Sequence, residues 1–448
     1  MPPRKADTKV LRVLERQRVP LPPHLDTARI RERLVEAAER AGVPDALEIR
    51  RRGLFANDAV GVVDIGEIAV EILPKTWDGA TADEGRAFLV DLLRFVGRDR
   101  GPFAMGAASI SEKDGGLAEV LFAWAVQTVS RHIDAGIPRR YMPRTEVSTA
   151  VRGRIDMKRV ALARPGRDFE LIIHHAPLSA DSDIGRAVRW LVREVVRRTR
   201  RAETRRAGQG LLNELHNVAD IEVSEALFDR IILRPLEEHW GPLLAFARSL
   251  ARQRSLDPAA AGGHPSVAVL FTLHDLFERA LRRVLQDHGP DMGLSPARIP
   301  RHLLAPEKGS GLVRLKPDYA IRLADIGNGE RLAVGDAKWK DIWRASGDPE
   351  PSRQDAYQLT AYMTAGGADA GFLFAPLVGG SGGAPLKVFW HTMAGSGTPV
   401  AVVGVHVPTL LRRDEPGKQL RHDLCGAIVT MLTGAARAAP APAPHASA

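Results

Sequence analysis

The chain has 448 residues, which suggests roughly three domains at the usual size of about 150 residues each. Apolar residues make up 44% and charged residues 26% of the chain, so collagen-like, wholly disordered and membrane-spanning classes are disfavoured. The formal net charge of +9 favours contact with a polyanion such as nucleic acid, although arginines on solvated helix faces produce the same excess.

A single cysteine, Cys425, excludes an internal disulfide framework and a multi-thiolate zinc site, and it fits a reducing compartment. The first residues are charged and lack the apolar core of a secretion signal, and no stretch supplies the roughly 20 apolar residues of a bilayer span. We therefore expect a cytoplasmic protein with no membrane partner.

A β-rich domain is expected at residues 1–80. Within residues 47–75, apolar and polar residues alternate with period two, and Gly and Asn between these runs are turn signals. Residues 81–254 are expected to be mainly helical, with a strand-like sequence pattern around residues 147–157. Within them, residues 184–206 carry nine Arg against two Glu, which predicts a helix with one basic side. That side either contacts phosphates or is simply solvated.

A linker is expected at residues 255–266, where Pro, Gly and Ala cluster, and a disordered Pro/Ala-rich tail at 435–448. Between them, residues 267–434 read as helix, two strands, helix, three strands and helix. This order predicts a mixed sheet flanked by helices, of the size of a nuclease domain. The whole chain is thus expected to be a multi-domain α/β protein with a β-rich start and a helical middle.

Two strand patterns in the last domain are joined through Gly-Asn-Gly, which is a hairpin signal. Alternate side chains of a strand face the same side, so Asp336 and Lys338 project together, and the hairpin register brings Asp318 to the same place. Carboxylates suit Mg²⁺, with Mn²⁺ as an alternative, and a lysine can orient the attacking water and stabilise the charge of the transition state. Asp318 and Asp336 are therefore candidate metal ligands, and Lys338 is a candidate catalytic residue. Lys340, on the same strand face, competes for that role.

Pro317 and Asp318, followed by Asp336-Ala-Lys338, resemble the PD-(D/E)xK nuclease motif, although a surface hairpin with an ordinary salt bridge gives the same pattern. In the helix pattern that follows, Gln358 and Tyr362 lie four residues apart on one side. They resemble the Q-x-x-x-Y element of several nucleases of this superfamily, in which these side chains support the active site or the bound strand.

Glu278, on the helix before the hairpin, is a candidate third acidic ligand, or it pairs instead with Arg282. The chain contains no G-x-x-x-x-G-K-[ST], so its own motifs bind no nucleotide.

From about residue 47 to 432 the chain resembles the McrC family, the endonuclease subunit of McrBC-type modification-dependent restriction systems. The resemblance rests on residues 66–75, 141–157 and 181–192 and on the motifs KPDYAI, VGDAKWK and DAYQLTAY. Gly185 departs from it, because the family has an asparagine there.

This resemblance implies an endonuclease of a 5-methylcytosine-type restriction system that cuts double-stranded DNA. A partner AAA+ GTPase of the McrB type would recognise the modified DNA, and this chain would dock on it and stimulate its hydrolysis. The N-terminal domain, with its apolar hairpin at residues 60–73, is the implied docking element, and residue by residue the core of that hairpin is expected to be structural. Two alternatives are a non-catalytic adaptor of the ring and a standalone DNA-repair exonuclease.

Overall fold

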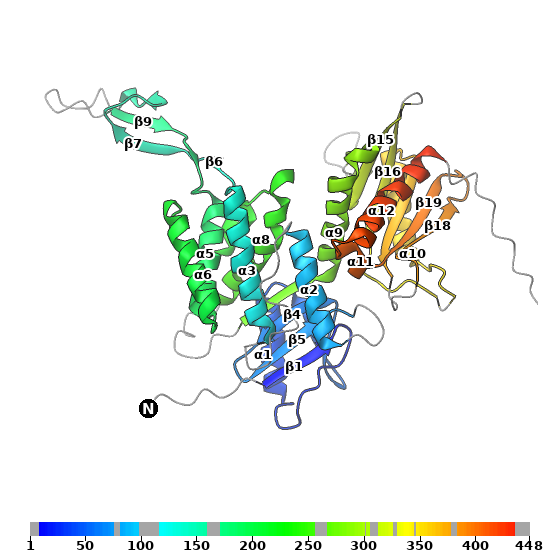
Figure 1. The fold of residues 1–448 in the computed structure, drawn as a ribbon, viewed down its shortest axis with the longest axis horizontal. Helices are drawn as coiled ribbons and strands as arrows, with labels where there is room; N and C mark the ends of the chain where they lie inside the picture. Colours follow the sequence, from blue (N-terminus) through cyan, green and yellow to red (C-terminus); the bar gives the residue numbers. More distant parts are fainter. Residues whose placement is uncertain are drawn as a thin grey trace, which may run out of the picture. The chain divides into compact units, whose positions relative to one another are not determined.

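The computed structural model of the chain describes residues 9–75, 81–97, 116–158, 171–255, 267–300, 302–304, 312–325, 329–344, 346–377 and 383–434. Apart from Ser255, the expected linker lies outside these residues, and so does the expected tail. The fold is mixed α/β with several separate sheets (Figure 1). Among the described residues, no helix is both long and apolar enough to cross a bilayer.

The chain forms two compact units whose boundaries differ from the expected domains. Unit 1 consists of Met1–Leu73 and Gly97–Phe271, and unit 2 of Pro74–Val96 and Thr272–Ala448. The β-rich start and the helical middle therefore share one unit, whereas the helix of residues 82–96 belongs to the C-terminal unit. This division arises because segments that are distant in the sequence pair with one another. The hydrophobic periodicity within a segment does not predict such pairing.

Unit 1 contains a sheet of β1 (Lys9–Leu14), β5 (Ile68–Leu73), β4 (Ala59–Asp64) and β11 (Val267–Thr272), in that order. Helix α1 (Ala28–Arg40) packs into the same core, and η1 (Pro44–Ala46) leads into the hairpin of β2 (Leu47–Arg50) and β3 (Gly53–Ala56). A Cβ on Gly61 would lie 1.9 Å from the carbonyl oxygen of Val269, so glycine permits the close approach of β11.

The apolar hairpin at residues 60–73 lies in the interior of unit 1. Every residue of β5 is buried, and β4 is buried except for Asp64. These side chains therefore form the core of the unit, which is the structural role expected for them residue by residue.

The rest of unit 1 combines a helical bundle with short strands. Its helices are α3 (Gly116–Ala135), α5 (Asp183–Arg198), α6 (Ala202–Glu214), α7 (Glu225–Arg230) and α8 (Gly241–Ser255), with η4 (Leu215–Asn217) and η5 (Pro235–Trp240) between them. Strands β6 (Arg140–Tyr141) and β10 (Leu178–Ser179) pair, and β7 (Arg144–Ser148), β9 (Leu171–His175) and β8 (Arg154–Ile155) form a second sheet. The middle of the chain is thus less purely helical than expected.

The arginines of α5 mainly hold the bundle together. Arg189 donates to two backbone carbonyls just beyond α6, and Arg193 forms an ion pair with Asp220. Arg198, only 4% exposed, lies 3.2 Å from the buried carboxylate of Glu194. The basic side of this helix is therefore largely committed to contacts within the protein.

Gly185 has a packing reason to lack a side chain. It lies in the first turn of α5, where its N–H donates to the N-cap Ser182. A Cβ at this position would lie 2.1 Å from the carbonyl oxygen of Ala180. An asparagine, which the resemblance led us to expect here, would therefore require the backbone to shift.

Unit 2 is built on a six-stranded sheet flanked by helices. The strands are, in order, β12 (Leu294–Pro296), β15 (Tyr319–Asp325), β16 (Gly329–Ala337), β17 (Ala370–Pro376), β19 (Pro399–Val405) and β18 (Leu386–Thr392). The helices are α2 (Ala82–Val96), α9 (Leu273–His288), α10 (Arg353–Gly366), α11 (Val407–Leu411) and α12 (Glu415–Thr433), with η7 (Pro290–Met292) and the small hairpin of β13 (His302–Leu304) and β14 (Leu312–Arg314).

The elements of unit 2 follow the predicted order of helices and strands, with additional short strands. The predicted hairpin consists of β15 and β16, which are antiparallel: Tyr319 pairs with Gly335 at one end and Asp325 with Gly329 at the other. Residues 326–328 of its turn lie outside the described part. Helix α10 packs on the sheet through Val334 and Leu359, while the hydroxyl of Tyr319 binds α9. Tyr319 pairs with Gly335 and Ala320 with Val334, so the side chains of Tyr319 and Val334 point to opposite faces of the sheet. Helices α9 and α10, which contact these two residues, therefore cover opposite faces.

Candidate active site

Two aspartates face each other where the β15–β16 hairpin opens. Because Tyr319 pairs with Gly335, Asp318 and Asp336 form the next facing pair along the same register. The backbone N–H of Ala337 donates to Asp318 Oδ2 at 2.8 Å. Asp336 is only 3% exposed. Strand pairing thus brings together two carboxylates that are 18 residues apart in the sequence.

The environment makes ionisation of Asp318 costly. Burial, together with the negative charge of Asp336 and a smaller effect of Glu278, raises the pKa of Asp318 to about 7, although the N–H of Ala337 acts in the opposite direction. Around neutral pH the Asp318 carboxyl is therefore partly protonated in the protein alone. A cation bound beside it would favour the ionised form, since an opposite charge nearby stabilises a carboxylate.

Lys338 is held at the aspartate pair. Its ammonium forms an ion pair with Asp336 and donates to Gln358 Oε1 at 3.0 Å, and it lies 3.9 Å from Asp355. Burial lowers the pKa of Lys338, but the hydrogen bond to Asp336 and the surrounding carboxylates outweigh it, so the pKa is raised overall. The side chain is therefore a cation, suited to stabilising negative charge rather than to removing a proton.

Gln358 and Tyr362 lie on the inward side of α10 and complete a chain of hydrogen bonds from Lys338. The amide of Gln358 donates to the hydroxyl of Tyr362 at 2.7 Å, and that hydroxyl donates to the carbonyl oxygen of Lys316 at 3.1 Å. Because Lys316 lies two residues before Asp318, this chain ties the helix to both sides of the hairpin.

Lys340 has a different partner from Lys338. Its ammonium lies 3.2 Å and 3.3 Å from the two carboxylate oxygens of Asp355, which also accepts from Ser352 at 2.7 Å. Asp355 is buried, whereas the side chain of Lys340 is 46% exposed. The geometry thus distinguishes the two lysines: Lys338 pairs with the aspartate of the hairpin and Lys340 with the first turn of α10.

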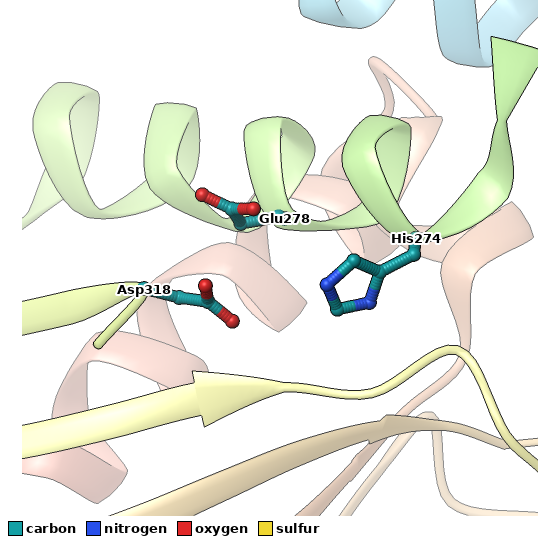
Figure 2. A group of neighbouring side chains, drawn as sticks. All are labelled: His274, Glu278 and Asp318. Carbon is teal, nitrogen blue, oxygen red and sulfur yellow. The ribbon is translucent and has the colours of Figure 1, made fainter. Parts of the chain in front are cut away.

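Helix α9 adds two potential metal-binding side chains to the open end of the hairpin. His274 and Glu278 are four residues apart and so lie on one side of the helix, pointing towards Asp318 (Figure 2). One donor atom from each of these three half-buried residues lies within 4.8 Å of the others. Sequence reasoning missed His274, although the His-x-x-x-Glu spacing on a helix is a signal for it.

Glu278 pairs with Arg282 and also lies beside the other two potential metal-binding side chains. One carboxylate oxygen is 2.5 Å from the guanidinium of Arg282, yet the same residue belongs to the group with Asp318. Arg282 also donates to the backbone carbonyl of Asp318 at 3.0 Å, and Tyr319 donates to that of Glu278 at 2.9 Å. These bonds fix α9 against β15, and they hold Glu278 beside Asp318. Asp336, the other predicted ligand, is paired with Lys338 and is not a member of the group.

The donor set fits a divalent cation. Carboxylate oxygens and an imidazole nitrogen are donors that divalent cations accept, and the three donor atoms lie within 4.8 Å of one another. Two carboxylates and one imidazole, all half-buried, leave room for water to complete the coordination.

Comparison with known proteins assigns the family. Two solved structures resemble the chain at 17% identity: a half-complex from a tetradecameric assembly of Thermococcus gammatolerans McrB AAA+ hexamers with bound McrC (TM-score 0.49, 94% of this chain and 100% of that chain) and the cryo-EM structure of the T. gammatolerans McrBC complex (TM-score 0.39, 65% and 90%). A search of curated proteins gives no match. The family profile for the McrBC 5-methylcytosine restriction system component matches residues 54–376, more than half of the chain, and the protein belongs to that family.

Proposed function

We propose that this chain is the nuclease subunit of an McrBC-type restriction complex. It would hydrolyse phosphodiester bonds of double-stranded DNA in a Mg²⁺-dependent reaction, with unit 2 as a nuclease domain of the PD-(D/E)xK type. The observation that carries this proposal is the meeting of Asp318, Asp336 and Lys338 at one end of the hairpin. Gln358, which accepts from Lys338 and donates to the hydroxyl of Tyr362, gives the proposal further support.

The charges of the site give a reason for metal dependence. Within the described part of the chain, the carboxyl groups of Asp318, Asp336 and Glu278 lie with two cations, Lys338 and Arg282, while Asp355 lies beside Lys338 and pairs with Lys340. A DNA phosphate brought to this place would meet net negative charge unless a cation were bound. Asp318 and Glu278, with Asp336 beside them, would hold that cation, which would polarise the phosphate and make a bound water more acidic.

The side chains of the protein have separable tasks in such a reaction. The ammonium of Lys338 would stabilise the negative charge that grows on the phosphate oxygens in the transition state. Gln358 would fix the position of that ammonium, since it accepts one of its hydrogen bonds. Tyr362 would orient the amide of Gln358 by accepting from it. Pre-organisation of this kind avoids the cost of arranging charges during the reaction.

We also propose that the chain acts with an AAA+ GTPase of the McrB type. Membership of the McrBC family supports this, and so does the missing phosphate-binding loop, because a GTP-driven motor has to come from another chain. The partner would recognise the modified base and translocate on DNA in the cytoplasm, and this chain would stimulate it and cut. The N-terminal β-rich region of this chain would be the part that docks on the ring.

The test is the Asp336→Ala variant in the reconstituted complex. It should abolish Mg²⁺-dependent cleavage while partner binding and GTP turnover stay near the wild-type level. A matched control is Asp423→Ala, which removes an exposed aspartate of α12 that binds Gln419. Undiminished cleavage by Asp336→Ala would refute the assignment of the site. Cutting of unmodified DNA by the isolated wild-type chain, without nucleotide, would instead favour a standalone exonuclease.

A further inference from the structure

Within the described residues, His274 has no hydrogen-bond or ion-pair partner although it lies among charged groups. It is half-buried in the first turn of α9, and none of the described residues forms a hydrogen bond or an ion pair with its imidazole. The neighbouring Leu273 and Phe277 are fully buried, so packing fixes which side of the helix His274 occupies. A half-buried ring in this position needs a ligand or water for its nitrogens.

The ring points to the place where two carboxylates meet. Figure 2 shows the imidazole directed from α9 towards Asp318, with Glu278 one helical turn further along. Its donor nitrogen and one oxygen from each carboxylate lie within 4.8 Å of one another. A neutral imidazole offers a lone pair in the plane of the ring, which suits a metal ion shared with these oxygens.

We infer that His274 is a ligand of the divalent ion bound at Asp318 and Glu278, and that its nitrogen makes the site prefer Mn²⁺ to Mg²⁺. Mg²⁺ strongly prefers oxygen ligands, whereas affinity for nitrogen ligands grows along the transition series. A set of one imidazole and two carboxylates therefore binds Mn²⁺ more tightly, even where Mg²⁺ supports cleavage. This inference rests on the proposed function, because it refines the metal site of the same active centre.

Metal binding by the full-length protein without DNA provides the test. Mn²⁺ binding is followed by electron paramagnetic resonance, and Mg²⁺ affinity is measured by competition. We expect the wild type to bind Mn²⁺ on the order of ten-fold more tightly than Mg²⁺, and to show magnetic coupling of Mn²⁺ to a nitrogen nucleus. His274→Ala should lose that coupling and on the order of ten-fold in Mn²⁺ affinity, with a smaller loss for Mg²⁺.

Two further variants make the result interpretable. His274→Gln keeps a polar side chain and an oxygen donor, so it should fold like the wild type, lack the nitrogen coupling and bind Mg²⁺ relatively better. His422→Ala removes an exposed histidine of α12 and should leave both the coupling and the affinities unchanged. Circular dichroism and thermal unfolding establish that each variant is folded.

The outcomes separate this inference from the proposed function. If Mn²⁺ binding depends on Asp318 but shows no nitrogen coupling, or if both His274 variants keep the coupling, His274 is not a ligand, while the nuclease proposal stands. If the coupling is lost in the His274 variants and Asp336→Ala still cuts DNA normally, the ligand assignment holds and the nuclease assignment fails. Absence of Mn²⁺ binding that depends on Asp318 would overturn the inference.

Discussion

Replacing Asp318 by asparagine should stabilise the metal-free protein at alkaline pH. Asparagine keeps an oxygen that can accept from the N–H of Ala337, but it removes a negative charge that is half-buried beside Asp336 and Glu278. The burial and the adjacent negative charges that raise the pKa of Asp318 to about 7 also make its ionised form unfavourable in the folded state. In the unfolded chain the same carboxyl ionises near its ordinary value of 3.8 at no such cost.

The sign and the size of the change in unfolding free energy follow from this difference in pKa between the folded and the unfolded chain. At pH below about 4 the carboxyl is protonated in both states, and the wild type carries no penalty. The penalty grows as the pH rises from about 4 to about 7 and is complete above that, with an upper limit of about 4 kcal/mol. Water reaches this half-buried group and weakens the effect, so we expect Asp318→Asn to be more stable by about 1–2 kcal/mol at about pH 8.

Hydrogen exchange of the β15 and β16 amides measures this locally, because it reports the free energy of opening these strands. In the presence of a chelator, protection in Asp318→Asn should exceed that of the wild type at about pH 8 and approach it at about pH 4.5. Adding Mg²⁺ or Mn²⁺ should reverse the order, since the ion stabilises only a site with its carboxylate intact. Asp341→Asn is the control, because Asp341 also accepts a backbone N–H, that of Trp343, but is exposed.

Two results would refute this reasoning. Equal or lower protection of Asp318→Asn at alkaline pH without metal would mean that the Asp318 carboxylate is not destabilised by burial and its neighbours. Equal protection of both proteins by added metal would mean that Asp318 does not hold the ion.

Three further predictions concern other residues of the site. Tyr362→Phe removes the hydroxyl between α10 and the hairpin, so the cleavage rate should fall about ten-fold, whereas Tyr357→Phe, at an exposed position, should not change it. In single-turnover cleavage, Lys338→Ala should lose at least about 100-fold in rate, while Lys340→Ala, which only frees Asp355, should keep most of it. Gly335→Ala would place a Cβ 2.0 Å from a buried phenylalanine ring of β17, and the urea midpoint should reveal a loss of about 1–3 kcal/mol.

Local sequence patterns were sufficient to predict the hairpin that carries the candidate active site. Period-two alternation and the Gly-Asn-Gly turn predicted two paired strands, and the register then placed Asp318 opposite Asp336, as the structure has them. The helical spacing of Gln358 and Tyr362 likewise predicted that both lie on one side of α10. These features depend on residues close in the sequence, whose backbone geometry determines which side chains share a face.

The role of the residues 60–73 hairpin depended on its surroundings. Its apolar residues are typical of core strands, and the pairing of β1 and β11 on either side of β4 and β5 shows which core they belong to. The Pro-, Gly- and Ala-rich sequence at residues 255–266 predicted a domain boundary. The strand that follows it, β11, pairs with β4 in the sheet of unit 1, so the boundary between the units comes after β11 begins.

Amino-acid order therefore specifies which side chains of this protein lie together on one strand or one helix, because backbone periodicity is a local property. It does not specify which distant face each of them meets. His274 and Asp318 are 44 residues apart, and they come together because α9 packs on β15 and is tied there by Arg282 and Tyr319. The raised pKa of Asp318 likewise has no signature in the sequence, since burial and neighbouring charge exist only once the chain is packed.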